Sequence, residues 1–313
     1  MNPTRYSIGI DIGGTKIAAA MVDGFGRASS VLTVPTPAKA GPRAILDAAA
    51  GLVERVVDVS GIVPAAFGLG SAGAFDLEGT VVSSTEHLSN WAGTEVAAEL
   101  QRRLGSPVSV LNDVHAAALG ELWTGQVPRS SMLFIAVGTG IGGAIVVDGR
   151  VMRGVSGLAG SIGHVTVRAA RSRMCSCGVP DHVEAYASGP AIELTYRDLT
   201  HTRLTLPEIG SRALSGEPEA LAVIREAAAL LAESVATTVT LSDPGAIVLG
   251  GGVLGLGEVF AAPLASHLAA HLPPLYAATT LEAAMLGNNA CLAGAAGVAL
   301  RVLDGASMSD FVA

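Results

Sequence analysis

One pattern occurs twice along this chain and constrains its fold more than any other feature: two short apolar runs separated by a turn rich in glycine. The first copy lies at 8–22, where "IGIDIG" and "KIAAAMVD" flank Gly14 and Thr15, and the second lies at 133–147, "LFIAVGTGIGGAIVV". Apolar runs joined by glycine are typical of β-hairpins, because glycine adopts the backbone angles that tight turns need. Helical segments and further apolar strands follow each copy. The sequence therefore predicts an α/β fold of two similar halves with a cleft between them.

The remaining elements follow from hydrophobic periodicity. Helical spacing of apolar residues predicts helices at 42–61, 114–123, 217–244 and 289–303, and continuous apolar runs predict strands at 65–73, 107–113 and 246–253. A chain of 313 residues is long enough for two domains of about 150 residues each. We expect a small N-terminal α/β domain over 1–113, joined by the C-terminal helix at about 293–313, and a large α/β domain over 114–292.

Composition limits the kind of core and argues against a membrane protein. Half of the residues are apolar but only 4% are aromatic, so the core must consist of Ala, Val, Leu and Ile. The apolar stretch at 130–147 is interrupted by glycines, which favours two buried strands over a membrane span. The N-terminus has no basic region that leads into an apolar run, so no signal peptide is expected.

Charge and cysteine content indicate a cytoplasmic protein that does not bind nucleic acid. A net charge of −8 at pH 7 opposes nucleic-acid binding, because that binding depends on neutralising phosphates. Three cysteines do not make a disulfide framework in a chain of this length, so we expect a reducing cytoplasm. Cys291 lies in the apolar run "NACLAGAAG" and is expected to be a small buried side chain.

Three glycine-rich turns at strand ends carry groups that suit a nucleotide. Glycine lets a ligand approach the backbone because it has no Cβ, and threonine and lysine add a hydroxyl and a cation. An aspartate at a strand end could hold Mg²⁺ through water. Any one of these segments could be only a tight turn, but three of them in a chain of two halves favour a bound nucleotide. The residues are Asp11, Gly13, Gly14, Thr15 and Lys16 in the first turn, Gly138, Thr139 and Gly140 in the second, and Gly251 and Gly252 in the third.

Longer segments around these turns resemble a known group of enzymes. "IGIDIGGTKIAAAMVD", "FIAVGTGIGGAIVVDGRV" and "PGAIVLGGGV" resemble the first phosphate, second phosphate and adenosine segments of the actin-like sugar kinases. "GLAGSIGH" followed by "CSCG" is similar to the signature of the ROK family (repressors, open reading frames, kinases). The resemblance runs from Ile8 to about Leu300. It implies two actin-like (ribonuclease H-like) domains, a homodimer, bound ATP and Mg²⁺, and phosphorylation of a hexose at its 6-hydroxyl.

The same family contains transcriptional regulators, so a non-catalytic sugar sensor is the alternative from another class. ROK repressors carry an additional N-terminal helix-turn-helix domain. Here the first phosphate segment starts by residue 8, which favours the kinase branch. A kinase-derived protein that has lost its activity is a third hypothesis.

Asp113 is the residue that we expect to act as catalytic base. It ends the strand at 107–113, where a carboxylate can accept the proton of a sugar hydroxyl. The residues alone leave a second role equally open, because aspartate is also a favoured N-cap for the helix that begins at Val114. The resemblance favours catalysis, since it implies that Asn112 and Asp113 contact the sugar and that Asp113 supplies the base.

Departures from the family pattern bear on the identity of the sugar. The resemblance places the sugar loop at 70–91, with Gly73 and Thr85 as contacts. Ser161 stands where the pattern G-E-x-G-H has glutamate, which removes a charged acceptor and leaves more room. This departure resembles the bacterial N-acetylmannosamine kinases, so we expect N-acetylmannosamine first, and glucose or another hexose next. Glu184 matches the family's second sugar-contacting carboxylate, although a glutamate on a surface helix would look the same in the sequence.

The segment "CSCGVPDHVE" at 175–184 resembles the zinc-binding part of the family pattern, C-x-C-G-x-x-G-C-x-E. The implied ligands are His164, Cys175, Cys177 and His182, the last of which replaces the third cysteine of the pattern. Two cysteines and two histidines make a closed tetrahedral site for a structural Zn²⁺. By anchoring His164, which in the family also touches the sugar 2-substituent, the zinc would orient a substrate contact. The alternative is that zinc has been lost.

Overall fold

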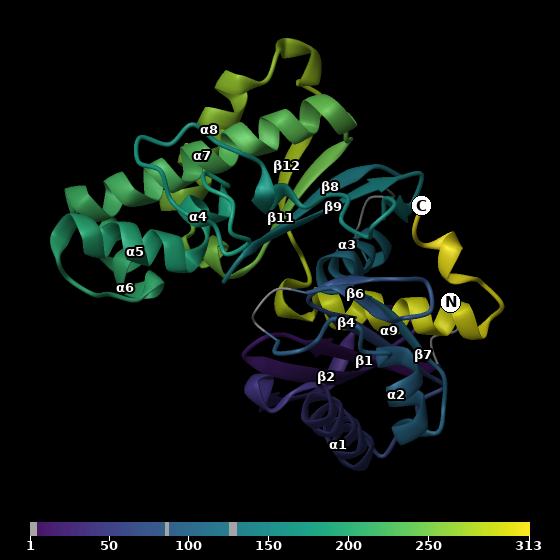
Figure 1. Ribbon diagram of the computed structural model, residues 1–313. Coiled ribbons are helices and arrows are strands. Elements are labelled where there is room, and N and C mark those ends of the chain that lie inside the picture. Colours follow the sequence, from purple (N-terminus) through teal and green to yellow (C-terminus); the bar gives the residue numbers. More distant parts are fainter. Residues whose placement is uncertain (1–4, 85–87, 125–129) are drawn as a thin grey trace. The chain divides into compact units, whose positions relative to one another are not determined.

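The computed structural model describes residues 5–84, 88–124 and 130–313, which form two compact units (Figure 1). The first unit comprises Met1–Ser130, Val146–Ala159 and Met285–Ala313, and the second comprises Ser131–Ile145 and Gly160–Ala284. Among the helices of the described residues, none combines the length and the hydrophobicity that a membrane span requires.

A five-stranded sheet forms the centre of the first unit. Its strands lie in the order β3 (Ala28–Pro35), β2 (Lys16–Asp23), β1 (Tyr6–Ile12), β4 (Ala66–Ser71) and β7 (Val108–Asn112). The β1–β2 and β2–β3 pairs are antiparallel, whereas β1, β4 and β7 run parallel. The hairpin predicted at 8–22 is therefore confirmed as β1 and β2. A separate antiparallel pair consists of β5 (Ala74–Phe75) and β6 (Val81–Ser83).

Helices cover both faces of this sheet (Figure 1). On one face lie α1 (Pro42–Ser60) and α2 (Val96–Leu104), and on the other lies α9 (Ala290–Leu303), against which α3 (Asp113–Thr124) packs. Successive residues of β1 face different helices, because the side chains of a strand point alternately to opposite sides of the sheet. Ile8 and Ile10 belong to the core under α1, while Gly9 between them faces α9.

Glycines let α9 lie directly on the backbone of the sheet and of α3. A Cβ at Gly9 would come within 2.1 Å of the Leu292 carbonyl oxygen, and a Cβ at Gly68 within 1.9 Å of the Ala295 carbonyl oxygen. Gly9 and Gly68 are register partners on β1 and β4, so they form one floor under the helix. On the helix itself, a Cβ at Gly294 would lie 1.7 Å from the Ala116 oxygen of α3. No side chain fits at these three positions, which explains the glycines in the apolar strands β1 and β4 and in α9.

Another five-stranded sheet carries the core of the second unit. Its order is β10 (Arg150–Val151), β9 (Ile141–Val147), β8 (Met132–Val137), β11 (Ala246–Gly250) and β12 (Thr280–Ala283). The strand β10 and the last two residues of β9 lie in the segment Val146–Ala159, which belongs to the first unit. The core joins this sheet to the long α7 (Pro218–Ser242) through residues such as Ile135, Leu231 and Val235. The other helices are α4 (Glu184–Ala187), α5 (Gly189–Thr200), α6 (Leu206–Leu214) and α8 (Glu258–His271). The strand, glycine turn and strand predicted at 133–147 are β8 and β9.

Short 3-10 helices complete the element order. They are η1 (Ala38–Ala40), η2 (Ile162–His164), η3 (Gly252–Leu256), η4 (Pro274–Tyr276), η5 (Gly287–Asn289) and η6 (Met308–Asp310).

The first unit includes three segments that the sequence analysis assigns to the large domain: 114–130, Val146–Ala159 and 285–292. The sequence analysis ends the small domain at Asp113 and assigns the following helix to the large domain. In the structure, α3 belongs to the first unit, together with the short segment Val146–Ala159. The reason is that α3 packs along α9, a contact between helices far apart in the sequence. The helix α9 also belongs to the first unit.

Candidate functional site

In the first unit, two carboxylates lie at the ends of neighbouring parallel strands. Asp11 on β1 is the register partner of Gly70 on β4, and Gly70 is the register partner of Leu111 on β7, which leads into Asn112 and Asp113. Carboxyl ends of parallel strands meet at one edge of a sheet, where α/β proteins place their ligands. The structure thus brings together the predicted metal-holding and catalytic aspartates, a hundred residues apart in the chain.

Hydrogen bonds fix the carboxylate of Asp113. Its Oδ1 accepts from the Val114 backbone N–H at 2.9 Å and from Asn112 Nδ2 at 3.0 Å. Asn112 Oδ1 in turn accepts from the N–H groups of Val114 at 2.9 Å and His115 at 3.1 Å, and Nδ2 donates to the Gly73 carbonyl at 3.0 Å. Bonds to the second and third amides of a helix are those of an N-cap. Asn112 is therefore the principal cap of α3, and Asp113 shares only one amide with it.

The surroundings raise the pKa of both carboxyl groups. Burial raises the pKa of Asp113, and its hydrogen bonds from Val114 and Asn112 oppose that shift. Burial, and secondly the neighbouring Asp113 charge, raise the pKa of Asp11 to about 7, while a hydrogen bond from Cys291 and the charge of Lys16 act in the opposite direction. Two carboxylates that share a site disfavour each other's ionised form. A cation beside Asp11 would relieve this repulsion.

Cys291 is a site residue that sequence reasoning missed. Its thiol is buried and is a hydrogen-bond partner of Asp11. A Cβ at Gly70 would come within 2.3 Å of Cys291 Sγ and 3.2 Å of Asp113 Cα, so the glycine makes room for the sulfur. Burial, and then the charges of Asp11 and Asp113, raise the pKa of this thiol well above its ordinary value. The apolar run around Cys291 gave no signal of these polar partners.

Two turns carry the expected phosphate-binding residues, one in each unit. In the first, the Gly13 N–H donates to the Lys16 carbonyl at 3.0 Å, and Thr36 Oγ1 donates to the Gly13 carbonyl at 2.7 Å, which leaves the side chains of Thr15 and Lys16 exposed. In the second, the Gly138 N–H donates to the Gly140 carbonyl at 2.8 Å. Both turns are thus closed by their own backbone and keep their outer surface accessible.

The third predicted turn, at 251–252, has a structural reason for one of its glycines. Gly251 has a φ of +94°, and a Cβ there would lie 2.3 Å from the Val137 carbonyl oxygen at the end of β8. Gly252 has no atom within 4 Å of its Cβ position and is exposed. Packing against β8 therefore explains Gly251, whereas Gly252 is open to a ligand.

The four expected metal ligands lie together in the second unit. Nitrogen and sulfur atoms of His164, Cys175, Cys177 and His182 all lie within 4.8 Å of one another. Cys177 Sγ is 3.1 Å from His182 Nδ1, Cys175 Sγ is 3.8 Å from His164 Nδ1, and the two cysteines are free thiols. Ligands of a tetrahedral zinc with two sulfurs and two nitrogens are separated by about 3.4–3.8 Å. The donor set and its spacing fit Zn²⁺ after a small contraction.

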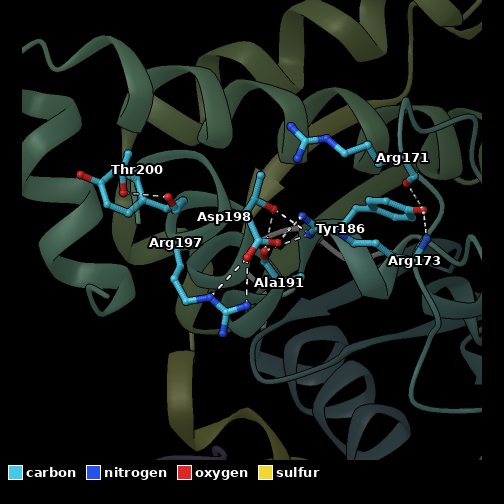
Figure 2. Close-up of polar contacts among 9 residues, drawn as sticks. Arg171, Arg173, Tyr186, Ala191, Arg197, Asp198 and Thr200 are labelled. Carbon is cyan, nitrogen blue, oxygen red and sulfur yellow. Dashed lines mark hydrogen bonds and ion pairs between the residues drawn. The ribbon is translucent and has the colours of Figure 1, made fainter. Parts of the chain in front are cut away.

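A set of polar contacts anchors the loop that carries these ligands (Figure 2). The Tyr186 hydroxyl accepts from the Arg173 N–H at 2.8 Å and lies 2.8 Å from the Arg171 carbonyl and 2.6 Å from Asp181 Oδ1. The Arg173 side chain crosses the Tyr186 ring and donates to Thr195 Oγ1 on α5 at 2.7 Å. These contacts tie the loop to α4 and α5.

Asp181 occupies the position at which the family pattern has glycine, and the structure gives the reason for both residues. Its φ is +63°, in the left-handed region that glycine enters at least cost. The aspartate gains compensating bonds from Tyr186, from Ser172 Oγ at 3.2 Å and from the Arg173 N–H at 3.1 Å. These hydrogen bonds of the Asp181 side chain offset the cost of a left-handed backbone conformation, which glycine would adopt without that cost.

The remaining expected sugar contacts are divided between the units. Gly73 has a φ of +114° and accepts from Asn112 in the first unit. In the second, Ser161 precedes η2, and Glu184 begins α4, where Oε2 accepts from the Ile141 N–H at 2.9 Å and Oε1 from Ser176 Oγ at 2.8 Å. Glu184 is therefore not a free surface carboxylate. Thr85 lies outside the described residues.

Comparisons with known proteins identify the family. The sequence model of the ROK family matches residues 7–302, almost the whole chain. The chain belongs to the ROK family. As the solved ROK kinases imply, its fold is of the α/β class with two actin-like, ribonuclease H-like domains.

ROK relatives of two substrate classes are similarly close to this chain. A glucokinase from Streptomyces coelicolor is 33% identical over 316 residues, covering 94% of this chain and 97% of its own length. An N-acetylmannosamine kinase from Citrobacter koseri is 34% identical over 291 residues, covering 93% and 97%. Among solved structures, a ROK family glucokinase from Streptomyces griseus in complex with glucose and AMPPNP is 32% identical, with a TM-score of 0.84 over 95% of this chain and 99% of that one. Identity alone therefore does not separate the two substrates.

Proposed function

We propose that this ROK-family sugar kinase transfers the γ-phosphoryl group of ATP to the 6-hydroxyl of N-acetylmannosamine. The observation that carries the proposal of catalysis is the placement of Asp113, fixed by Asn112 and the Val114 amide next to Asp11. Relatives named as kinases at 30–34% identity support the same conclusion.

Asp113 is the proposed catalytic base. The hydrogen bonds to Oδ1 hold the carboxylate in one orientation, so it can accept the proton of the 6-hydroxyl as that oxygen attacks the phosphorus atom. A raised pKa makes the carboxylate a stronger base than an exposed aspartate. Such a base contributes about 10²–10⁴ in rate.

ATP and Mg²⁺ are the proposed partners of the glycine turns and of Asp11. The backbone N–H groups and the side chains of Thr15, Lys16 and Thr139 suit phosphate oxygens. Asp11 would hold Mg²⁺ through water, and the metal would neutralise charge on the transferring phosphoryl group. Bound Mg²⁺ would also keep Asp11 ionised, which opposes the effect of Asp113 on its pKa.

Substrate choice rests on Ser161. Serine is shorter than the glutamate of the family pattern and carries no charge, so it offers space for a 2-acetamido group and lacks a charged acceptor for glucose hydroxyls. The second candidate is glucose, which the glucokinase relatives at similar identity favour. A Ser161→Glu variant should shift the preference of kcat/KM toward glucose, by about tenfold or more for one charged hydrogen bond.

The experiment that tests the reaction is ATP-coupled turnover with glucose, N-acetylglucosamine, N-acetylmannosamine, mannose and fructose. We expect the highest kcat/KM on N-acetylmannosamine. Asp113→Asn should lower kcat by about 10²-fold or more while sugar binding, measured by calorimetry, persists. Binding of a sugar without turnover of any would instead identify a sensor, and full activity of Asp113→Asn would remove Asp113 as base.

We further propose that the cluster of His164, Cys175, Cys177 and His182 binds one structural Zn²⁺ per chain. Metal analysis of purified protein should find about one zinc per chain, and His182→Ala should lose it because three ligands no longer close the site. Surface His201→Ala is the matched control, since His201 caps α5 away from the cluster. Zinc-free wild-type protein with an unchanged melting temperature would refute the proposal.

A further inference from the structure

Glu184 stands between the metal cluster and the second glycine turn. Its Oε2 accepts from the Ile141 N–H at 2.9 Å, directly after Gly138–Gly140, and its Oε1 accepts from Ser176 Oγ at 2.8 Å, between the two cysteines. All of these residues belong to the second unit. We propose that Ser176 and Glu184 connect the metal loop to this turn, so that both act as positioning residues for nucleotide binding.

Gly140 shows how closely Glu184 and the turn are fitted. A Cβ at position 140 would lie 2.6 Å from Glu184 Oε2, whereas a Cβ at Gly138 would have no atom within 4 Å. The carboxylate is therefore packed against the turn as well as hydrogen-bonded to it. A residue with a Cβ at position 140 would therefore displace the Glu184 carboxylate from the turn.

Besides its internal bond, the turn is tied to neighbouring helices by one hydrogen bond at each end. The Gly138 carbonyl accepts from the Gly189 N–H at the start of α5, at 2.8 Å. The Ile141 N–H donates to Glu184, which lies five residues earlier in the chain than Gly189, at the start of α4. The first bond is between backbone groups, but the second depends on a side chain. The position of this end of the turn therefore depends on the conformation of the Glu184 side chain.

Ser176 sets the orientation of Glu184. Its neighbours Cys175 and Cys177 are two of the four metal-ligating residues, and Glu184 Oε1 also lies 3.8 Å from Cys175 Sγ. A metal that fixes both cysteines fixes the serine between them and thereby the carboxylate. Such outer contacts commonly orient groups around a metal site. The connection goes beyond the sugar contact that family resemblance gives Glu184, and rests on the proposal that 138–140 binds ATP phosphates.

Amide hydrogen exchange of Ile141, followed by NMR without ATP or sugar, tests the connection. Glu184→Ala removes the acceptor and should speed exchange by about tenfold or more, and Ser176→Ala should speed it about two- to fivefold. Glu184→Gln keeps one carbonyl oxygen for Ile141 and should restore most of the protection. Removing the metal with a chelator should speed exchange in wild-type protein, but much less in Ser176→Ala.

The matched control is Ser172→Ala, a serine in the same loop whose hydroxyl contacts Asp181 and not Glu184. It should leave Ile141 exchange unchanged. The affinity for a non-hydrolysable ATP analogue, measured by calorimetry without sugar, should fall by similar factors in the Glu184→Ala and Ser176→Ala variants only. Unchanged exchange in Glu184→Ala, or equal effects in Ser172→Ala, would overturn the inference. Because exchange is read without substrates, a failure of the proposed kinase activity would be seen separately.

Discussion

Replacing Gly68 by alanine should destabilise the first unit more than any other single methyl group added to its sheet. The new Cβ would lie 1.9 Å from the Ala295 carbonyl oxygen and 2.3 Å from its carbon. Both partners are backbone atoms, so no side-chain rotation relieves the clash. Either α9 or β4 must move by about 1 Å or more, and adding methylene groups to a packed core costs about 1–3 kcal/mol, occasionally more.

The upper end of that range applies here, because the displaced helix also packs on Gly9 and on α3. A loss of about 3 kcal/mol lowers the melting temperature by roughly 6–12 °C in a domain of this size. The assay is thermal unfolding followed by circular dichroism. Gly51→Ala is the matched control, since Gly51 lies in α1 with nothing within 4 Å of its Cβ position. Alanine there should stabilise the protein by about 0.5–1 kcal/mol. A Gly68→Ala variant that melts with the wild type would refute backbone contact between α9 and β4.

Three further predictions concern buried polar groups of the first unit. Burial lowers the pKa of His115 to about 4, so the folded protein favours the neutral imidazole and loses stability as pH falls from 6.5 toward 4. The free energy of unfolding, measured with urea, should fall between pH 7.5 and pH 5 by about 2 kcal/mol more in wild type than in His115→Gln. Cys291→Ala removes a hydrogen bond to Asp11 and should raise the Mg²⁺ concentration for half-maximal turnover about two- to fivefold. Cys291→Ser keeps a hydrogen-bond donor and should leave this concentration unchanged. Equal effects of the two variants would show that only the side-chain volume at position 291 matters. Buried Glu121 accepts from the N–H groups of Met285 at 2.9 Å and Leu286 at 2.7 Å. Glu121→Gln should therefore lower the free energy of unfolding, measured with urea, by about 1–3 kcal/mol, and an unchanged free energy would contradict this role.

Local features of the fold could be predicted from the sequence, and features that depend on distant contacts could not. The hairpin of β1 and β2 follows from two apolar runs and the glycines between them, all within 18 residues. The place of α3 in the first unit depends on α9, whose residues lie far along the chain. The role of Gly9 and Gly68 could not be predicted, because the helix α9 that requires them lies far along the chain from both strands.

The same distinction holds for the candidate site. Asp11, Asp113 and the four proposed zinc ligands could be singled out because each stands in a short motif, and the structure brings the four His and Cys side chains together. Which residue caps α3 could not be predicted, since Asn112 and Asp113 are both favoured N-caps and only the hydrogen bonds separate them. Cys291 and Glu121 were missed because their partners come from distant parts of the chain.

The place of α9 after the second unit in the sequence has a consequence for synthesis. The strands β1, β2, β4 and β7 leave the ribosome early, but the helix that covers their glycine face emerges only after the second unit has been made. The second unit is complete once Ala284 has left the ribosome. The second unit can therefore fold before the first one, and until α9 emerges one face of the N-terminal sheet stays uncovered. A stop codon just before Ala290 would therefore deprive the earliest strands of the helix that covers one face of their sheet.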